Sequence, residues 1–465
     1  MPEELYRQQA QKRPAQQGYR LSFGPESLWY LDKLSPHSPV YNVPFLSRLR
    51  GRLDVGALER ALNALVERQG VLRTVFMASG GAPLALVLKK RAVELKQFDL
   101  RHLPEWQPEA EARRVSKLEA SRRFDLARDH MLRTFLFRLA GEEYLFLAIT
   151  HHIVFELGSL KILYGDLSSF YNAFAAGRPS ELPPLAFKDS DFSVWQRQHL
   201  DGERLERLNR YWKEQLTGAP SVNLPLDFPR PRVHGNRGVR HFFDLPPDLR
   251  STALTEFFRG LGSTPYRGLL AAFYIFLYGY SGLTDICVGS PFASRCPGIE
   301  KTIGFFANTL VLRIDISGNP TFREVVKKVD RVALRTIANS DLSFEKIVEA
   351  VRPARDPSRT PLFQISFRGR TEPYACLQFD GMMADRPEFI DNGTAKFDLA
   401  LEIEATTGKA CFFEYCTDLF TEETIIQMEI NFQNVLRELV SGPDARLSEL
   451  ASVAEISQSL RQTSI

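Results

Sequence analysis

The sequence predicts a mixed α/β protein with two subdomains of similar size. Apolar runs of strand length alternate with amphipathic, helix-like segments in both halves of the 465 residues, without the strict repetition of βαβ units. A proline-rich passage at 179–186 separates the halves and is the best candidate for a linker. The composition, 44% apolar and 25% charged, is that of a soluble globular protein, and 34 phenylalanines can fill a substantial core.

The first subdomain, at 21–178, follows a polar N-terminal arm at 1–20. Its clearest helix is placed by Asp54, which can cap the N-terminus, and by Gly70, which ends an apolar stripe of helical spacing. We expect, in order, a helix at 21–34, a strand at 41–49, a helix at 54–70, strands at 71–76 and 84–89, a helix at 109–120, strands at 132–139 and 144–152, and a helix at 159–176.

The second subdomain is expected at 187–445. Its most apolar helix follows Thr264 and Pro265, which supply an N-cap and a proline in the first turn, and it is too short to cross a bilayer. The last residues, 446–465, are polar and resemble an inter-domain linker. After the segment 187–196 we expect a long charged helix that ends near 216, a strand at 241–245, helices at 249–261 and 265–278, strands at 286–289 and 310–314, a helix at 321–338, strands at 362–367, 399–404 and 410–415, and a helix at 422–439.

Charge and cysteine content limit the class of protein. The formal charge of +3 is small for this length and argues against a general nucleic-acid binder. The five cysteines are odd in number, and their spacing fits neither a zinc site nor a disulfide framework. The polar N-terminus lacks the apolar core of a signal peptide. We therefore expect a reduced, cytoplasmic protein that does not enter a membrane.

The strongest functional signal is the short stretch from Thr150 to Ser159, which contains His151 and His152. It follows an apolar run at 144–149 that is long enough for one buried strand. Side chains in a strand alternate between the two faces. If the strand continues this far, the two imidazoles point in opposite directions, so that one can do chemistry while the other is structural. Glycine-rich phosphate loops, Rossmann fingerprints and the Gly-x-Ser-x-Gly pattern of serine hydrolases do not occur.

Across nearly its whole length, the chain resembles a condensation domain of a nonribosomal peptide synthetase. The family signature is His-His-x-x-x-Asp-Gly, and the chain has His-His-Ile-Val-Phe-Glu-Leu at 151–157. Seven ordered partial matches are far more specific than any single one. The other six are Leu28-Trp29, the segment 68–76, 191–195 (Asp-Phe-Ser-Val-Trp), 303–309 (Ile-Gly-Phe-Phe-Ala-Asn-Thr), 341–345 (Asp-Leu-Ser-Phe-Glu) and 355–362 (Arg-Asp-Pro-Ser-Arg-Thr-Pro-Leu).

The resemblance implies two chloramphenicol-acetyltransferase-like subdomains that form a V-shaped pseudo-dimer with a central tunnel. Donor and acceptor carrier proteins would insert phosphopantetheine arms from opposite sides, one carrying an acyl or peptidyl thioester and the other an aminoacyl thioester. The domain would bind no cofactor covalently, would act as a monomer, and would precede an adenylation domain in the same polypeptide. The products of such synthetases are secondary metabolites.

By the same resemblance, His152 faces the tunnel as the catalytic residue and His151 is structural. A neutral imidazole can accept the proton that the attacking amine loses, or it can only position the amine, and the sequence leaves both roles open. Because two tethered substrates are already close, proximity supplies part of the rate. Backbone N–H groups near Leu157 and Gly158 are candidates for stabilising the oxyanion. Further positions expected to line the tunnel are Ser159, Asn308 and Ser358.

Two departures from the family pattern affect the site. Glu156 replaces the family's aspartate, which is thought to pair with an arginine, and Arg295 is the expected partner here. If that pair is buried, loss of one partner would cost about 3–5 kcal/mol. Leu157 replaces the family's glycine. A leucine is costly if the position needs positive φ, and its side chain could narrow the acceptor side of the tunnel.

Three functions follow from these observations. The first is an amide-forming condensation domain, either internal or a starter domain that N-acylates the first amino acid with a fatty acyl group, since about twenty residues precede the first motif. The second is a noncatalytic condensation-like domain that docks a carrier protein or recruits a tailoring enzyme, an alternative favoured by Glu156 and Leu157. The third is a free-standing acyltransferase that uses coenzyme A thioesters, which the linker-like C-terminus disfavours.

Overall fold

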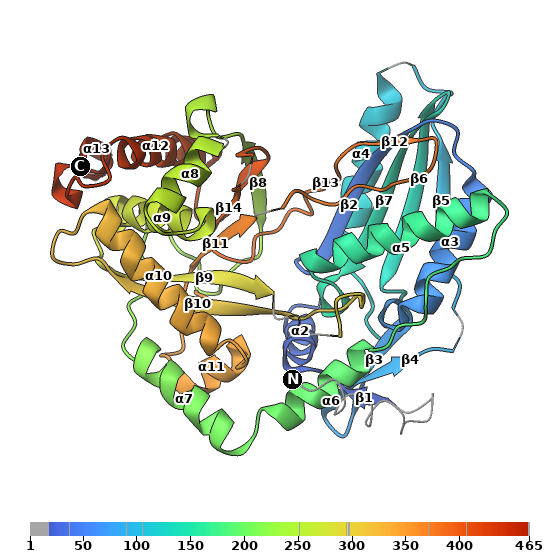
Figure 1. The fold of residues 1–465 in the computed structure, drawn as a ribbon, viewed down its shortest axis with the longest axis horizontal. Coiled ribbons are helices and arrows are strands. Elements are labelled where there is room, and N and C mark those ends of the chain that lie inside the picture. Colours follow the sequence, from blue (N-terminus) through green and yellow to red (C-terminus); the bar gives the residue numbers. More distant parts are fainter. Residues whose placement is uncertain are drawn as a thin grey trace. The chain divides into compact units, whose positions relative to one another are not determined.

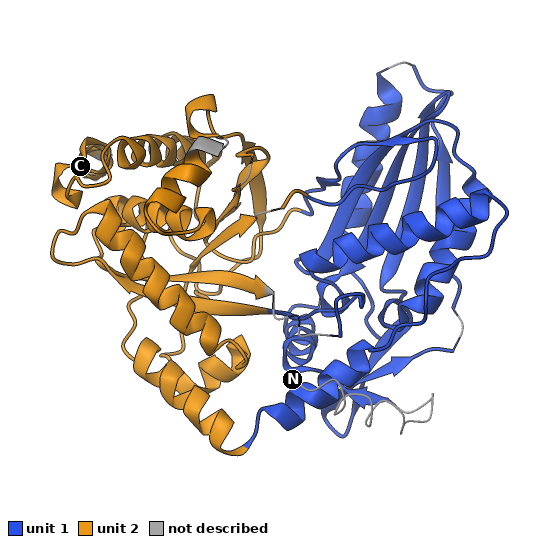
Figure 2. Cartoon of the chain, viewed as in Figure 1, with its two compact units in different colours: residues 1–201, 293–307, 374–392 blue, residues 202–292, 308–373, 393–465 orange. Residues whose placement is uncertain are grey.

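The computed structural model describes residues 18–463 apart from positions 37, 90, 105, 251, 294, 296, 297, 371 and 406, so most of the expected arm at 1–20 lies outside the described residues. The chain is mixed α/β and divides into two compact units (Figures 1 and 2). Unit 1 comprises residues up to Asp201 together with 293–307 and 374–392, and unit 2 comprises the remainder. This confirms the predicted fold class. The second half of the sequence is divided differently from the prediction, because two of its segments belong to unit 1.

The main sheet of unit 1 has the strand order β12-β2-β7-β6-β5, in which β12 is Met383–Ala384, and β13 (Glu388–Phe389) also pairs with β2. Strands β2 (Asn42–Arg50) and β7 (Glu143–His151) pair antiparallel along their full length. Strand β6 (Leu132–Ala140) is antiparallel to β7, and β5 (Leu95–Asp99) is parallel to β6. Almost every residue of β7 is buried, which is the pattern of a strand covered on both faces.

Three long helices accompany this sheet. Helices α3 (Val55–Arg68) and α5 (Leu157–Ala175) pack against each other, and α4 (Gln107–Ala120) packs on β6, β2 and β7 (Figure 1). Asp54 caps α3 as expected, because its carboxylate accepts a hydrogen bond from the Ala57 N–H. Helix α2 (Phe23–Leu34) and helix α6 (Asp189–His199) complete the helices of unit 1 in the part of the chain that the structure describes.

The predicted strand at 71–76 differs from the structure at its beginning. A 3-10 turn occupies Gly70–Arg73, and β3 (Thr74–Ser79) pairs with β4 (Ala82–Val87), which in turn pairs with β1 (Tyr19–Arg20). The strand begins later than predicted because the last carbonyl groups of α3 need hydrogen-bond donors. The Arg73 guanidinium supplies them by donating to the carbonyl oxygens of Val66 and Glu67, both at 2.6 Å, and this contact wraps the chain tightly around the helix end.

Two segments from the second half of the sequence belong to unit 1, and we call them the first excursion (293–307) and the second excursion (374–392). The second excursion contains β12 (Met383–Ala384) and β13 (Glu388–Phe389), which are both antiparallel to β2. The expected linker at 179–186 lies inside unit 1, which continues through α6 to Asp201 (Figure 2). Sequence patterns could not reveal this exchange, because strand pairs of two residues leave no periodicity.

The sheet of unit 2 has the order β10-β9-β11-β14-β15-β8. Strand β11 (Ile365–Arg370) runs parallel to β14 (Leu399–Glu404), and β15 (Cys411–Cys416) lies antiparallel between β14 and β8 (Gly238–Phe243). The other strands are β9 (Asp285–Ala293) and β10 (Ala307–Asp315). The apolar face of the sheet contributes to a core that includes Leu401, Phe413 and Phe367.

The helices of unit 2 are arranged around α9 (Pro265–Ser281), which is almost completely buried. Thr264 caps α9 and Pro265 lies in its first turn, as predicted. Helices α10 (Phe322–Ala338), α12 (Glu422–Ser441), α13 and α8 (Thr252–Gly260) pack on it (Figure 1). The long charged helix expected to end near 216 is α7 (Gly202–Leu216), which packs against α11 (Phe344–Val351). Helix α6 ends before Gly202, where φ is +48°.

The C-terminal residues differ from the expected irregular linker. Residues Ala451–Thr463 form helix α13, which packs on α9 and α12. Val453 and Ile456 are buried there, and Ile456 lies against Gly279 of α9. The polar composition that indicated a linker is the exposed face of this helix, whose other face packs on unit 2 through Val453, Ile456 and the partly buried Leu460.

Candidate functional site

The histidine pair lies at the end of β7 in unit 1. Strand pairing with β2 ends at His151, which is opposite Asn42. The next residue, His152, donates its backbone N–H to the Tyr41 carbonyl oxygen at 2.8 Å and begins a 3-10 turn that spans His152–Val154. The strand therefore stops between the two histidines, so the alternation of strand side chains is not what separates them. The change from strand to turn gives them different surroundings instead.

His151 is a buried residue with 4% of its surface exposed. Its Nδ1 accepts a hydrogen bond from the Ile153 N–H at 3.1 Å, and its ring lies near the rings of Tyr41 and Phe124, with centroid distances of 6.1 and 5.7 Å. A nitrogen that accepts from a backbone N–H uses its lone pair in that bond. The neutral ring of His151 consequently carries its proton on Nε2, and its Nδ1 stabilises the turn.

His152 is half-buried, and its Nδ1 is 3.0 Å from the Phe155 carbonyl oxygen. A carbonyl oxygen can only accept a hydrogen bond, so this contact requires a proton on Nδ1. In the neutral ring, Nε2 is then the basic nitrogen. The two neighbouring histidines are held in opposite tautomers by their own backbone, and only His152 has the tautomer in which Nε2 can accept a proton.

Glu156 and Arg295 form the predicted ion pair, with 2.8 Å between Arg295 Nε and Glu156 Oε1. Burial raises the pKa of the Glu156 carboxyl, and the charge of Arg295 and backbone N–H groups of Phe306 and Ala307 offset part of that rise. Arg295 also donates to the carbonyl oxygens of Ile299 at 3.1 Å and of Thr302 at 2.9 Å. The longer glutamate side chain therefore retains a buried pair, which attaches the first excursion to the start of α5.

Leu157 shows no backbone strain. It is the first residue of α5 and has helical geometry, and the non-glycine residues with positive φ among those described are Asn319, Arg352, Leu362 and Ala410. The Leu157 side chain is half-buried and packs against the core of unit 1. The condition for strain, a positive φ at this position, is therefore not met, because Leu157 lies in the first turn of a helix. The expectation that Leu157 narrows a tunnel stays a prediction.

The contacts around Gly158 and Ser159 indicate structural roles for both residues. A Cβ added at Gly158 would lie 3.2 Å from Arg295 Nε and 3.3 Å from Glu156 Oε1, so the glycine leaves room for the ion pair. Ser159 is fully buried, and its hydroxyl donates to the Gly304 carbonyl oxygen at 2.9 Å and accepts from Arg295 Nη2 at 2.8 Å. Ser159 was expected at the tunnel wall, but its hydroxyl is committed to holding the first excursion.

The two remaining positions predicted for the site, Asn308 and Ser358, lie in unit 2, and their side chains also form hydrogen bonds that stabilise loops. The Asn308 amide donates to the carbonyl oxygens of Ser340 and Leu342, both at 2.8 Å, and accepts from the Phe344 N–H at 3.0 Å. Ser358 donates its hydroxyl and its N–H to the carboxylate of Asp356. Asn308 thereby ties β10 to the N-terminus of α11, and Ser358 closes a local turn.

Sequence patterns missed the contacts of two side chains, Gln69 and Phe305. Gln69 is 1% exposed and bonds to Asp166 and to the backbone of Lys301 and Ile303. Phe305 places its ring 6.0 Å from the His152 ring. Gln69 follows the last turn of a helix and Phe305 lies within a motif that resembles the family, but neither position has a chemical signature that identifies its partner.

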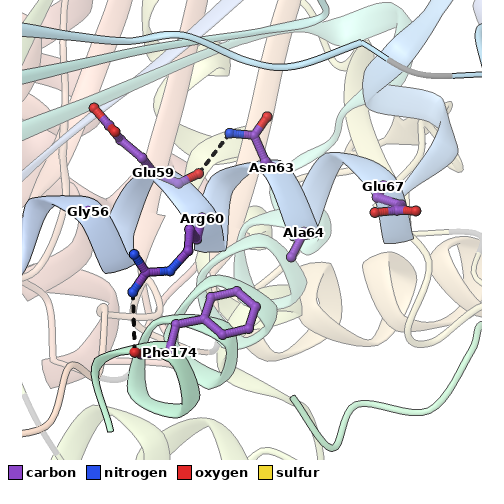
Figure 3. A pocket seen from close by; sticks show the side chains of 7 residues that line it. All are labelled: Gly56, Glu59, Arg60, Asn63, Ala64, Glu67 and Phe174. Atoms are coloured by element: carbon purple, nitrogen blue, oxygen red, sulfur yellow. Dashed lines mark hydrogen bonds between the residues drawn. The ribbon is translucent and has the colours of Figure 1, made fainter. Parts of the chain in front are cut away.

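A shallow depression of about 500 Å³ on the outer surface of unit 1 contains none of the predicted site residues (Figure 3). Side chains of α3 line it together with Phe174 from the end of α5, and Arg60 donates to the Phe174 carbonyl oxygen. Its polar groups are the solvent-facing residues of a helix, and we assign it no part in the chemistry.

The chain belongs to the condensation domain family, which matches residues 15–460. It is 39% identical over 446 residues to a linear gramicidin synthase protein of Brevibacillus parabrevis, covering 95% of this chain and 6% of that protein. It is 37% identical over 440 residues to phosphinothricin tripeptide synthetase PhsC of Streptomyces viridochromogenes, covering 92% of this chain and 40% of that protein. The chain thus spans only a small part of these synthetases.

Solved structures support the same fold. The X-domain from teicoplanin biosynthesis is 26% identical, with a TM-score of 0.83 over 94% of this chain and 98% of the X-domain. The first condensation domain of the calcium-dependent antibiotic synthetase, at 22% identity, has a TM-score of 0.80 over 94% of this chain and all of that domain. Within the described residues, no helix combines the length and the apolar character that crossing a bilayer requires.

Proposed function

We propose that this domain forms an amide bond between a carrier-bound acyl or peptidyl thioester and the amine of a carrier-bound aminoacyl thioester. The observation that carries the proposal is the tautomer of His152: its Nδ1 is bound to the Phe155 carbonyl oxygen, which leaves Nε2 as the basic nitrogen. Membership of the condensation domain family supports the reaction class. Both substrates would arrive on phosphopantetheine arms, and the domain would use no cofactor of its own.

The chemistry needs little beyond alignment and one proton transfer. The neutral amine attacks the donor carbonyl, the C–N bond forms, the C–S bond breaks, and the proton that the nitrogen loses ends on the departing thiol. His152 Nε2 can carry that proton between the two atoms or hold the amine by a hydrogen bond. The thioester is already activated, so no covalent intermediate on the protein is required. Glu156 and Arg295 would act by keeping the backbone after His152 in place.

Removing the imidazole tests the proposal. Octanoyl-CoA, octanoyl thioester on a carrier domain and dipeptidyl thioester on a carrier domain serve as donors, and aminoacyl-N-acetylcysteamine thioesters serve as acceptors. We expect His152→Ala to reduce amide formation, followed by mass spectrometry, by at least about a hundredfold. His102→Ala is the matched control, because His102 is an exposed histidine of the same unit. Equal rates for His152→Ala and the wild type would refute the proposal.

The same donors separate the two forms of this function. A starter domain would use the octanoyl thioesters, and an internal domain would use the dipeptidyl thioester. Of the solved relatives, the starter condensation domain of rhizomide synthetase is 18% identical with a TM-score of 0.80, which shows the fold alone. A preference of at least about tenfold for one donor class, or about 1.4 kcal/mol, would assign the position of the domain in its synthetase.

A second candidate function is the recruitment of a tailoring enzyme without catalysis. The likeness to the teicoplanin X-domain favours it, because that X-domain has been solved in complex with OxyB at 27% identity to this chain. The departure at Leu157 no longer supports this alternative through strain, since the residue is helical. Amide formation by none of the donors, together with micromolar binding of a tailoring enzyme encoded beside the same synthetase, would support recruitment.

A further inference from the structure

The first excursion is fastened to unit 1 through the residues that immediately precede Phe305. Gln69 accepts a hydrogen bond from the Ile303 N–H at 3.0 Å and donates to the Lys301 carbonyl oxygen at 3.0 Å. Ser159 bonds to both the N–H and the carbonyl oxygen of Gly304. These contacts hold the backbone itself. The backbone of the next residue, Phe305, is therefore held in place as well, and the remaining freedom is that of its side chain.

The Phe305 ring occupies space that only a glycine in α2 leaves open. A Cβ added at Gly24 would lie 2.7 Å from Cε1 and 2.9 Å from Cδ1 of Phe305, closer than any real contact allows. The other side of the contact is His152, whose ring centroid is 6.0 Å from that of Phe305, with the two planes at 81°. This is an ordinary edge-to-face geometry for neighbouring rings. Phe305 therefore packs between the backbone of α2 and the imidazole.

The imidazole of His152 has three identified restraints. Its Nδ1 is bound to the Phe155 carbonyl oxygen, the Tyr41 ring lies with its centroid 6.5 Å away, and the Phe305 ring is closer. The hydrogen bond positions Nδ1, and packing against the neighbouring rings further restricts the orientation of the imidazole and thereby the direction of Nε2.

We propose that Phe305 is a positioning residue that aims His152 Nε2 by packing between the imidazole and Gly24. This inference rests on the proposed function, because an aimed nitrogen matters only if His152 meets the reactants. Loss of the phenyl ring removes one of these restraints, and small displacements of an aligned group reduce rates strongly. Phe305 does not itself touch the reacting atoms in this proposal, and its effect passes through His152.

Four variants test the proposal by kinetics with the thioester substrates above. Phe305→Ala removes the ring, Phe305→Leu keeps apolar volume, Gly24→Ala forces the ring to move, and the double variant Gly24→Ala/Phe305→Ala gives the new methyl group room. We expect Phe305→Ala to lower kcat about tenfold with the acceptor KM changed less than about twofold, and Phe305→Leu to lose about threefold. Gly24→Ala should lower kcat in the wild-type background and have no further effect when Phe305 is absent.

A spectroscopic measurement separates aiming from stability. In protein with ¹⁵N-labelled histidine, the His152 signals are assigned by their loss in His152→Ala, and the wild type should show a protonated Nδ1. Phe305→Ala should move these nitrogen shifts toward a mixture of tautomers. Phe174→Ala is the matched control: Phe174 stacks on Phe170 at the same centroid distance of 6.0 Å, at the far end of α5 from the histidines. It should change neither kcat nor the His152 shifts.

The outcomes distinguish this proposal from the proposed function. Unchanged His152 shifts and unchanged kcat in Phe305→Ala would overturn the positioning role, even if His152→Ala is inactive. A lower melting temperature with unchanged His152 shifts would also overturn it, because Phe305 would then be only a packing residue. If no variant and no wild type forms amide, the nitrogen shifts still decide whether Phe305 orients the ring, while the proposed function fails separately.

Discussion

The first and second excursions both leave unit 2 for unit 1, but they are attached by different forces. The first is held by the buried side chains of Gln69 and Ser159, which bond to its backbone, and by the ion pair between its own Arg295 and Glu156. The second has buried contacts near both ends, with Leu377, Phe379 and Ile390 in the core of unit 1 and hydrogen bonds to Ser168 and Asn172. Its middle, 383–389, is held by two strand pairs of two residues each and by ion pairs with half-exposed partners.

This difference indicates what each segment can do. Buried polar contacts are costly to leave unpaired, so the first excursion should open only with unit 1 itself. Exposed ion pairs contribute little and weaken with salt, so the middle of the second excursion, 383–389, should open locally. The segment that carries Phe305 is the more firmly attached one, which suits the positioning role that we propose for Phe305.

The largest expected effect comes from breaking the buried ion pair. Arg295→Ala leaves the Glu156 carboxylate buried without its cation and removes three further hydrogen bonds. We expect the free energy of unfolding, measured with urea, to fall by about 3–5 kcal/mol. Arg295→Ala/Glu156→Gln should recover part of that loss, because the buried charge is gone. A loss below about 1 kcal/mol for Arg295→Ala would contradict a tightly attached first excursion.

The pH dependence of the unfolding free energy of Arg295→Ala gives a second test of the buried ion pair. Burial raises the pKa of Glu156 above its unfolded value, so the folded protein binds the proton more tightly. Its contribution to stability is therefore fully present below the unfolded pKa and is lost as pH rises through the folded pKa. Without Arg295 the folded pKa should rise further, and the fall in stability with increasing pH should extend to higher pH. Glu156→Gln should remove this component.

An intermediate effect is expected at Gln69. Gln69→Leu keeps the apolar stem and removes the hydrogen bonds to Asp166, Lys301 and Ile303. Leaving buried backbone groups unpaired should cost about 1–3 kcal/mol of unfolding free energy and should reduce hydrogen-exchange protection of the Ile303 amide. Glu67→Leu is the control, since Glu67 is an exposed residue of α3 beside the depression in Figure 3. Protection at Ile303 that equals the wild type in Gln69→Leu would contradict this role.

The smallest effect is expected at the second excursion. Arg113 donates to Glu388 at 2.6 and 3.0 Å, but Glu388 is half-exposed. Arg113→Ala should cost less than about 1 kcal/mol and should raise hydrogen exchange at Glu388 and Phe389. Raising NaCl from about 0.1 to 1 M should produce a similar increase in the wild type and none at Ile303. Exchange that rises equally at both excursions would remove the distinction between them.

Long periodic or capped segments were predictable from the sequence. The apolar run at 144–149 lies in β7, Asp54 caps α3, and Thr264 with Pro265 begins α9, because these signals act within a few residues. The pairing of Glu156 with Arg295 was also anticipated, although 139 positions separate them, and it came from the family resemblance. The helical start at Leu157 was missed, because a short 3-10 turn after His151 shifts the helix by two residues from its expected beginning.

By itself the sequence determined the alternation of strands and helices, the motif order of a condensation domain and the presence of adjacent histidines. The tertiary structure decided which of them keeps Nε2 basic, because that choice depends on a carbonyl group whose direction is set by the turn after β7. It also decided that two segments of the second half join unit 1 and that Gly24 leaves room for Phe305. Such contacts depend on distances between residues far apart in the chain, which local propensity does not encode.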